Sequence, residues 1–419
     1  MYIYIYKLRI LVTGAGLAGP TAAFWLTKAG HEVTIVERFS QLRAAGQQID
    51  IRGPAVEVVK RMGLMETFKS KVVPERGLKF VDDRNRQFAF FGVNTDEKSF
   101  TTEYEIMRGD FCEILYQATK DSVTYIFNRT VESFTQDENS VQVRFSDGHE
   151  ETFDMLIGAD GIRSRTRKMM LGTDYSGPDP FRSLRFRVAY FSVPSHPDDG
   201  WEFTSYHTTQ RRFVATRKNH PDTLQAYFSI VTDSAEADAI DRQPIDEQKK
   251  FWAKTFQDAG WQSQRLISGM LGSDEAKNFY HEHVGQVKME SWHQGRVVLV
   301  GDAASCPSPL SGSGTTCGIA GAYVLAGEIA KHCKHSSDMA AVDAAFKGYE
   351  TAYRPFINIV QELPASPEFM FPKSHLGIWV LRFVLQVAAK FRIQAVIDLF
   401  SSHDGDWKLP YYGERESRQ

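Results

Sequence analysis

The first forty residues alternate between short apolar runs and helical spacing, and this pattern predicts a β-α-β unit. Leu8–Thr13 is an apolar run rich in β-forming residues, followed by Gly14 and by helical spacing up to Gly30. Val33–Glu37 is a second apolar run. A strand, a helix and a strand within about thirty residues form the smallest module of a parallel sheet. Residues 1–7 alternate with period two, which predicts an extension of the first strand and not a signal peptide.

Farther along the chain, helical spacing recurs at Pro54–Gly63, over residues 244–270 and beyond residue 340, ending in a long apolar segment at Leu376–Phe400. Strands are predicted at Val81–Phe91, Val141–Phe145, Asp154–Gly158, Arg296–Val300, Leu184–Val193, Glu202–Thr208, Phe213–Arg217 and Leu224–Val231. No helix separates those between residues 180 and 235, so they predict an antiparallel sheet in a layer of its own. No uncharged apolar run reaches the roughly 18 residues of a membrane span.

Composition and charge restrict the class of protein. The chain has 419 residues, with 49 Lys and Arg against 52 Asp and Glu and a net charge of −3. The length suggests two or three domains or one large composite fold, and the near-neutral charge disfavours nucleic acid as the main partner, because phosphate binding needs a basic face. Four cysteines without Cys-x-x-Cys spacing do not make a disulfide framework, so we expect a cytoplasmic protein. The 29 Phe, 16 Tyr and 7 Trp could fill a large core or could line a site for a flat ligand.

The turn after the first predicted strand has the glycine spacing of a dinucleotide site. It reads Gly14-Ala15-Gly16-Leu17-Ala18-Gly19, and Glu37 ends the next strand. In such a turn the first glycine permits a tight bend, the second lets the backbone approach a pyrophosphate, and the third lets helix and strand pack closely. A carboxylate at Glu37 would accept hydrogen bonds from a ribose and would repel a 2′-phosphate. The turn therefore favours NAD or the ADP half of FAD over NADP.

Two further turns follow buried strands. The first, MLIGADGIRSRTR, contains Asp160 and leads into a helix rich in arginine; by itself it fits a solvated basic face equally well. The second, GRVVLVGDAASCPSPLSGSG, places Asp302 just after a strand and ends at Gly312 and Gly314, a Gly-x-Gly pair at the start of a helix. Asp302 could bind a ribose or ribityl hydroxyl, and the nearby N–H groups could contact a ring oxygen. A purely structural Gly/Pro loop is the alternative.

The order GAGLAGP…VTIVER, MLIGADGIRSRTR and VVLVGDAASCPSPLSGSG resembles the single-component (class A) flavoprotein monooxygenases with the para-hydroxybenzoate hydroxylase fold, over residues 8–360. The segments GQQIDIRGPAVEVVKRMGL, IMRGDFCEIL and VKMESWHQG resemble a narrower branch, which contains tetracycline-inactivating monooxygenases and hydroxylases of polycyclic polyketides. The resemblance implies an α/β fold: a Rossmann-like FAD-binding domain of the GR2 type, an inserted, mainly antiparallel β-sheet substrate domain, and a C-terminal helical segment. The implied boundaries are 1–72, 104–176 and 285–340 for the first domain, 73–103 and 177–284 for the second, and 341–419 for helices that bridge the two.

The resemblance also assigns roles to residues. Those expected to bind FAD are Gly14, Gly16, Gly19, Glu37, Arg38, Asp50, Arg108, Asp160, Asp302, Pro309, Gly312 and Gly314. Arg43 matches a position implicated in nicotinamide binding. Ser305 stands where a histidine is frequent, and Thr315 and Thr316 replace an asparagine that often follows the second glycine. Hydrogen bonding around the isoalloxazine ring is therefore expected to differ from the family pattern.

The implied activity is that of an NAD(P)H-dependent monooxygenase. NAD(P)H would reduce FAD, O2 would form a hydroperoxide at flavin C4a, and the terminal hydroxyl would pass to a polycyclic aromatic or enolic substrate. Tyr206, His207 and Arg217, on the predicted sheet, are candidates for contacting the substrate; otherwise they are ordinary sheet residues. The Phe and Tyr residues of that sheet, and of the helix after Pro372, are expected to face the flavin. The substrate, the choice between NADH and NADPH, and the choice among hydroxylation, epoxidation and ring-opening oxidation stay open.

Other interpretations stay open beside this one. A reductase or halogenase could share the fold, although the halogenase segment Trp-x-Trp-x-Ile-Pro is absent, and a flavoprotein could bind a polycyclic ligand without turnover. His281-x-His283 has no third ligand nearby in sequence, so no metal is expected. The segment with Arg382, Gln386 and Lys390 predicts a helix that covers the substrate entrance, as a similar helix does in the tetracycline-inactivating branch; binding to a membrane surface is the less favoured alternative. We expect a monomer or weak homodimer.

Overall fold

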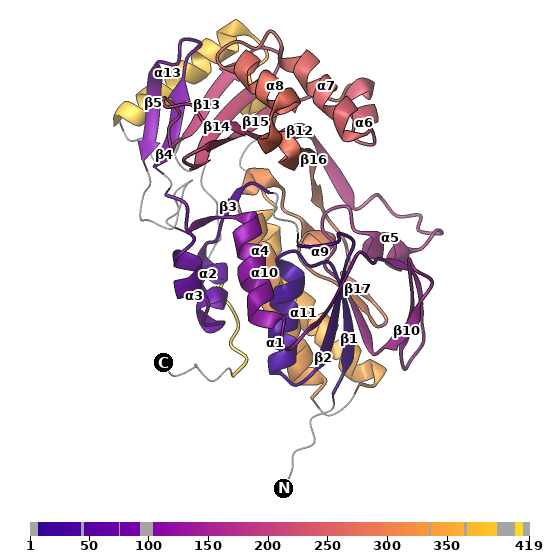
Figure 1. The fold of residues 1–419 in the computed structure, drawn as a ribbon. Coiled ribbons are helices and arrows are strands. Elements are labelled where there is room, and N and C mark those ends of the chain that lie inside the picture. The colour runs from indigo at the N-terminus through magenta and orange to yellow at the C-terminus, as the bar shows by residue number, and fades with distance from the viewer. Residues whose placement is uncertain are drawn as a thin grey trace.

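The computed structural model describes residues 7–42, 46–74, 76–92, 104–334, 337–363, 367–391 and 407–413. These residues form two lobes, with the β-α-β unit of the first glycine turn in one and a large, mainly antiparallel sheet in the other (Figure 1). None of the helices described here is long and apolar enough to cross a membrane.

The first lobe is built on a sheet with the order β17-β18-β11-β1-β2-β7. Its strands are β1 (Arg9–Thr13), β2 (Glu32–Glu37), β7 (Thr124–Phe127), β11 (Met155–Gly158), β17 (His293–Gln294) and β18 (Val297–Leu299). All adjacent pairs are parallel except β17 with β18. Strands β11 and β18 are buried along their whole length, which is why their sequences read as continuous apolar runs.

Helices and a small sheet pack around this parallel sheet. The helices are α1 (Ala18–Lys28), α2 (Gly53–Arg61), α3 (Met65–Lys69), α4 (Arg108–Thr119), α5 (Arg165–Leu171), α9 (Asp302–Ser305), α10 (Gly314–His332) and α11 (Met339–Val360). The additional strands are β8 (Val131–Gln136), β9 (Val141–Phe145) and β10 (Glu150–Phe153), which form one antiparallel sheet, and the pair β3 (Gln48–Asp50) with β6 (Glu105–Met107). Helix α1 lies against α10, and α10 lies against α11. The predicted β-α-β unit and the helix at residues 54–63 are confirmed.

The second lobe is a seven-stranded sheet with the order β16-β12-β15-β14-β13-β4-β5. Its strands are β4 (Gly77–Val81), β5 (Gln87–Gly92), β12 (Phe181–Pro194), β13 (Phe203–Thr208), β14 (Arg212–His220), β15 (Thr223–Val231) and β16 (Tyr280–Val287). One face packs against α7 (Ile245–Phe256) and α8 (Ser263–Gly272), and α6 (Ala235–Ile240) lies beside them. The other face contacts Leu310 of the first lobe, and we call it the ligand-facing side.

One predicted strand is wrong. The sequence predicted a single strand over Val81–Phe91, whereas the chain turns back on itself between β4 and β5. The carboxylate of Asp82 accepts hydrogen bonds from the backbone N–H groups of Arg84 (3.0 Å) and Arg86 (2.9 Å), and Asn85 adopts a positive φ of 59°. An aspartate that bonds the backbone two residues ahead favours a turn, and this local preference outweighs the apolar pattern around it.

The C-terminal helices contact both lobes. Helix α11 packs against α10, while α12 (Pro367–Met370) and α13 (His375–Phe391) lie by the large sheet (Figure 1). Residues 392–400 of the predicted apolar segment lie outside the described part of the chain. The expectation that aromatic side chains of this helix face the flavin stays a prediction; Phe383 is 56% exposed. The helix is apolar on two sides, and sequence alone did not show which side is buried.

Candidate functional site

The turn between β1 and α1 is shaped by its glycines. Gly14 has a φ of +102°, and a Cβ atom there would lie 2.6 Å from the carbonyl oxygen of Ala159. A Cβ at Gly19 would lie 2.1 Å from the carbonyl oxygen of Gly14, so neither position tolerates a larger residue. At Gly16 a Cβ would meet only Nη2 of Arg108, at 3.5 Å. Gly16 therefore leaves its backbone accessible, as pyrophosphate binding requires.

The neighbouring groups at this turn suit an anion with an attached ribose. Among the described residues, none caps the N-terminus of α1 through its side chain, so the first N–H groups of the helix favour an anionic partner. The Glu37 carboxylate accepts hydrogen bonds from the N–H groups of Ala15 (2.9 Å) and Phe39 (3.1 Å), which places it at the edge of the turn. The guanidinium of Arg38 lies 4.7 Å from the centre of the Phe39 ring.

Arg108 and Asp302 bring two other segments to the same turn. Arg108 begins α4, and Asp302 begins α9 directly after Gly301. A Cβ at Gly301 would lie 3.0 Å from Cβ of Ala18, so the third glycine turn packs against α1. Burial raises the pKa of the Asp302 carboxyl, while a hydrogen bond with Cys306 and the positive charge of Arg108 oppose the rise. The starts of α1, α4 and α9 therefore converge on one place.

The loop before α10 leaves open space beside this place. Ser308 and Gly312 have positive φ values of 84° and 66°, and a short 3₁₀ turn spans Pro309–Ser311. A Cβ at Gly312 or Gly314 would meet no atom within 4 Å. Leu310 of the same loop packs against the ligand-facing side of the large sheet. The loop thus touches both lobes and exposes its glycine backbone between them.

Two of the residues predicted to bind FAD form hydrogen bonds or ion pairs with other residues of the protein. Asp50 pairs with Arg52 (Oδ2 to Nε, 2.5 Å), and the N–H of Arg52 donates to the hydroxyl of Thr316 (3.1 Å). Asp160 accepts hydrogen bonds from the first two N–H groups of α5, at 2.8 and 3.0 Å, and so anchors that helix. The ligand role of each stays a prediction. Arg43 lies outside the described residues.

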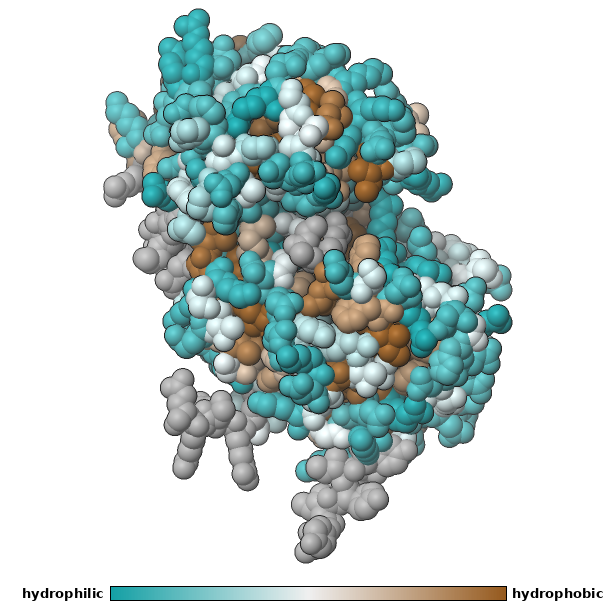
Figure 2. Space-filling model, viewed as in Figure 1, coloured by the Kyte–Doolittle hydropathy of each residue, from teal (hydrophilic) through white to brown (hydrophobic). Residues whose placement is uncertain are grey.

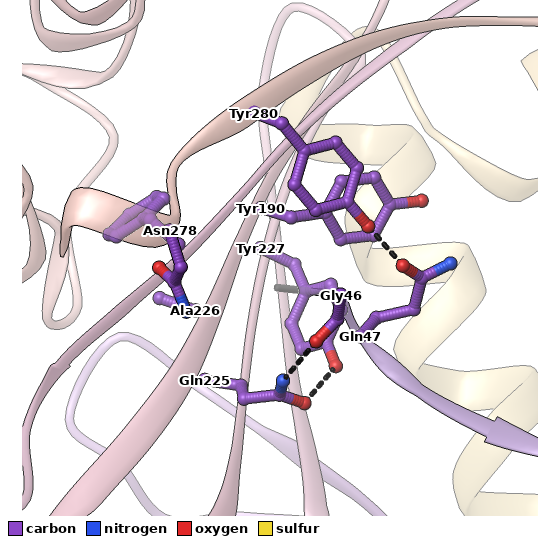
Figure 3. Close-up of a pocket in the computed structure, with 9 residues that line it drawn as sticks. Gly46, Gln47, Tyr190, Gln225, Ala226, Tyr227, Asn278 and Tyr280 are labelled. Carbon is purple, nitrogen blue, oxygen red and sulfur yellow. Dashed lines mark hydrogen bonds between the residues drawn. The ribbon is translucent and has the colours of Figure 1, made fainter. Parts of the chain in front are cut away.

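Beside Gly46 and Gln47, the large sheet presents three tyrosines (Figure 3). The rings of Tyr190 and Tyr280 stack with their centres 4.6 Å apart, and Tyr227 meets Tyr190 edge-on at 5.5 Å. The cavity between them is small, about 10 Å³, which is room for about one water molecule. A drug-sized ligand needs about 300–1,000 Å³, so such a ligand would lie outside this cavity, along the sheet. On the visible face of the molecule, several apolar residues lie near the junction of the lobes (Figure 2).

A polar network joins these tyrosines to the segment at residues 46–48. The amide oxygen of Gln225 accepts a hydrogen bond from the Tyr227 hydroxyl (3.0 Å), and its Nε2 donates to the carbonyl oxygen of Gly46 (3.3 Å). The Tyr280 hydroxyl donates to the amide oxygen of Gln47 (Figure 3). The sequence predicts aromatic residues on this sheet but does not single out any of these side chains. The two-residue spacing of Gln225 and Tyr227, which puts them on one face of a strand, is the signal that identifies them.

The structure separates the residues predicted to contact substrate. Tyr206 lies on the helix-covered face of the sheet, with its ring 5.7 Å from that of Trp261. Arg217 is buried on the ligand-facing side and donates from Nη1 to Oε2 of Glu105 (2.7 Å). The same carboxylate accepts a hydrogen bond from Gln48 (2.6 Å). Arg217 therefore ties the large sheet to the first lobe.

His207 lies on the ligand-facing side among phenylalanine rings. The ring centres of Phe213, Phe80 and Phe371 are 4.9, 6.0 and 6.0 Å from that of the imidazole. Burial, assisted by the positive charge of Arg382, lowers the pKa of His207 to about 4. The imidazole is therefore neutral at pH 7 and offers one donor and one acceptor inside an aromatic surrounding.

His281 and His283 share one face of β16, as their spacing predicted. Nε2 of His281 and Nδ1 of His283 each lie 2.7 Å from the carboxylate of Asp241. Burial disfavours the Asp241 anion, but these hydrogen bonds and the charge of Arg187 outweigh it and hold its pKa well below the usual range. Within the described part of the chain, no group of three or more His, Cys, Asp or Glu side chains is arranged to bind a metal ion.

The chain belongs to the FAD binding domain family, whose model matches residues 7–359. It is a flavoprotein monooxygenase, because its relatives over nearly the whole chain are enzymes of that class. The FAD-dependent monooxygenase asL4 of Sarocladium schorii is 39% identical, covering 97% of this chain and 99% of that protein. The flavin-dependent monooxygenase eupH of a Phoma species is 38% identical, covering 97% of both chains.

Solved structures agree with this assignment. The crystal structure of tetracycline destructase Tet(51) matches with a TM-score of 0.77 at 30% identity, covering 98% of this chain and 100% of that one. Tet(55) matches with a TM-score of 0.79 at 29% identity, covering 97% of this chain and 99% of that one. The class A hydroxylase fold predicted from the three glycine turns is confirmed.

Proposed function

We propose that this monooxygenase uses NAD(P)H and O2 to hydroxylate a flat polycyclic aromatic or enolic compound held against the large sheet. The observation that supports it best is the ring-lined, ligand-facing side of that sheet, with a tyrosine and amide network at one end and His207 among phenylalanines at the other. Flat rings bind well to such surfaces, and the few polar groups would fix their orientation. The tetracycline destructases among the structural relatives favour the same substrate class.

The residues at the convergence of the glycine turns fit FAD. Bound FAD would supply electron transfer from NAD(P)H and the activation of O2. The open backbone at Gly16 and the start of α1 suit its pyrophosphate, and Glu37 suits the adenosine ribose. Arg108 and Asp302 suit the pyrophosphate and the ribityl hydroxyls, and the open space along residues 312–314 suits the edge of the ring.

The chain's own groups would orient the substrate and exclude water. With a pKa of about 4, the His207 imidazole is a weak base, so it would accept a hydrogen bond from a phenol or enol hydroxyl without removing the proton. That bond would raise electron density on the substrate carbon. Gln225 and Tyr227 would hold polar substituents at the other end, and the phenylalanine rings would keep water from the reacting atoms.

The test is a substrate panel of tetracyclines, anthraquinones and simple phenols with the FAD-loaded enzyme. We expect at least one polycyclic compound to stimulate NADH or NADPH oxidation and to gain the mass of one oxygen atom. Tight binding of a polycyclic compound without turnover would instead support a sequestering flavoprotein. Failure of every ligand to promote reduction of the flavin by either nicotinamide would contradict the proposal.

Paired variants on β13 sharpen this test, because adjacent residues of a strand face opposite sides. We expect His207→Phe, on the ligand-facing side, to raise KM or lower kcat for the accepted substrate about ten-fold, the effect of one lost hydrogen bond. Tyr206→Phe, on the helix-covered face, is the matched control and should leave both constants near their wild-type values. Equal effects of the two changes would argue against binding on this side of the sheet.

A further inference from the structure

Helix α13 carries an exposed apolar stripe on the lobe distant from the labelled chain ends (Figure 1). Its exposed large side chains are Leu376, Trp379, Val380, Phe383, Val384 and Phe391. Their spacing follows i, i+3, i+4, i+7 and i+8, so the first five form one line along the helix. Trp379 and Phe383, 63% and 56% exposed, stack with their ring centres 5.9 Å apart. Contiguous exposed apolar surface of this kind marks an interaction site.

The opposite side of α13 already secures the helix to the protein. Leu385 is 1% exposed and packs with Leu78, Phe80 and Ala89 of β4 and β5, where Leu381 and Ala389 also contact the cluster. The guanidinium of Arg382 lies 5.5 Å from the centre of the Phe88 ring. The outer stripe is therefore not needed to hold the helix in place.

The charged residues of α13 and of the segment just before it are all basic. Residues 369–391 contain Lys373, Arg382 and Lys390 and no aspartate or glutamate. Lys390 is exposed in the last turn of the helix, and Lys373 is exposed just before its start. Long basic side chains at the ends of an apolar stripe can extend to lipid headgroups while their stems stay on the apolar surface. A basic helix with Trp, Phe and Leu on its outer side is typical of a helix that lies in a membrane interface.

We propose that the outer side of α13 docks on an anionic bilayer surface, with Trp379 and Phe383 inserted at the level of the headgroups. The charge supports this occupant, since each Lys or Arg near an anionic surface strengthens binding about five-fold. The stripe lies on the side of α13 opposite Leu385, so it is not part of the contact between the helix and the sheet.

The experiment is co-sedimentation of the FAD-loaded full chain with phosphatidylcholine vesicles that contain or lack phosphatidylserine. We expect binding to the vesicles with phosphatidylserine, weaker binding without it, and loss on adding salt. Trp379→Ser with Phe383→Ser should weaken binding about ten-fold or more, since burial of either ring contributes at least that much. Ile245→Ser with Leu271→Ser removes comparably exposed apolar side chains on α7 and α8 and is the matched control.

The outcomes decide the proposal. Retained FAD absorbance and an unchanged melting temperature show that a variant is folded, so that loss of vesicle binding reports on the stripe. Absence of sedimentation with anionic vesicles, or equal binding by the α13 and control variants, would overturn the proposal. A wild-type dimer that the α13 variant converts to a monomer, without lipid binding, would assign the stripe to a second copy of the chain instead.

Discussion

Two substitutions in the first glycine turn should separate folding from cofactor binding. At Gly19 an added methyl group would lie 2.1 Å from a backbone carbonyl oxygen, so the turn and α1 must move apart. Overpacking of this kind costs about 1–3 kcal/mol and more when backbone is the obstacle, so Gly19→Ala should destabilise the apoprotein by about 3 kcal/mol or more. At Gly16 the methyl group would be 3.5 Å from a flexible arginine end and φ is not positive. Gly16→Ala should therefore keep or raise stability, by up to about 1 kcal/mol.

Although Gly16→Ala should not reduce stability, it should weaken FAD binding. The methyl group of Gly16→Ala would occupy the approach of the pyrophosphate, and loss of one or two charge-assisted hydrogen bonds costs about 3 kcal/mol, or more than a hundred-fold in Kd. Urea unfolding of the apoprotein measures the first quantity, and fluorescence titration with FAD measures the second. A Gly16→Ala enzyme that is stable and binds FAD like the wild type would refute the assignment of this turn to the pyrophosphate.

Three further predictions follow from individual side chains. Asp302→Asn should change apoprotein stability by no more than about 1 kcal/mol, because the amide takes the place of a partly buried carboxyl of the same size. It should weaken FAD binding about ten-fold in the same titration. An unchanged affinity for FAD would contradict a contact with the ribityl chain. Arg217→Met should destabilise the protein by about 3 kcal/mol, because it leaves the carboxylate of Glu105 buried without the Arg217 cation. In a double-mutant cycle measured by urea unfolding, adding Glu105→Gln should recover part of this loss. Additive losses would refute the coupling between the two residues. The pKa of His207 falls from 6.5 to about 4 on folding, so its neutral form stabilises the fold above pH 6.5 and this contribution is lost as the pH falls toward 4. Between these pH values the wild type should lose about 1–3 kcal/mol more than His207→Phe, and parallel pH profiles would contradict the burial of this imidazole.

The parts of the fold that sequence predicted are those that local pattern controls. The β1-α1-β2 unit follows from an apolar run, a glycine turn and helical spacing, all within about thirty residues. The antiparallel strands follow from alternation between residues 180 and 235. The hairpin at Asp82 was not predicted, because the hydrogen bonds from the backbone to this one side chain outweigh the strand preference of the apolar residues around it.

The candidate site was predictable only in part, for a geometric reason. The backbone shape of the glycine turns is set locally, so the turns themselves could be identified from the spacing of their residues. The ion pair between Glu105 and Arg217 joins residues 112 positions apart, and no local pattern reveals it. Tyr206 and His207 were grouped as substrate candidates although adjacent strand residues face opposite sides. Both faces of this sheet are covered, so the polarity of the two side chains did not show which residue points toward the ligand.

Transfer of labelled oxygen tests the central claim most directly. The FAD-loaded enzyme is supplied with NAD(P)H, ¹⁸O-labelled dioxygen and a polycyclic compound that stimulates nicotinamide oxidation, and the product is analysed by mass spectrometry. The account predicts a product that carries one labelled oxygen atom. A modified product whose new oxygen comes from water, or nicotinamide oxidation that yields only peroxide with every compound of the panel, would contradict it.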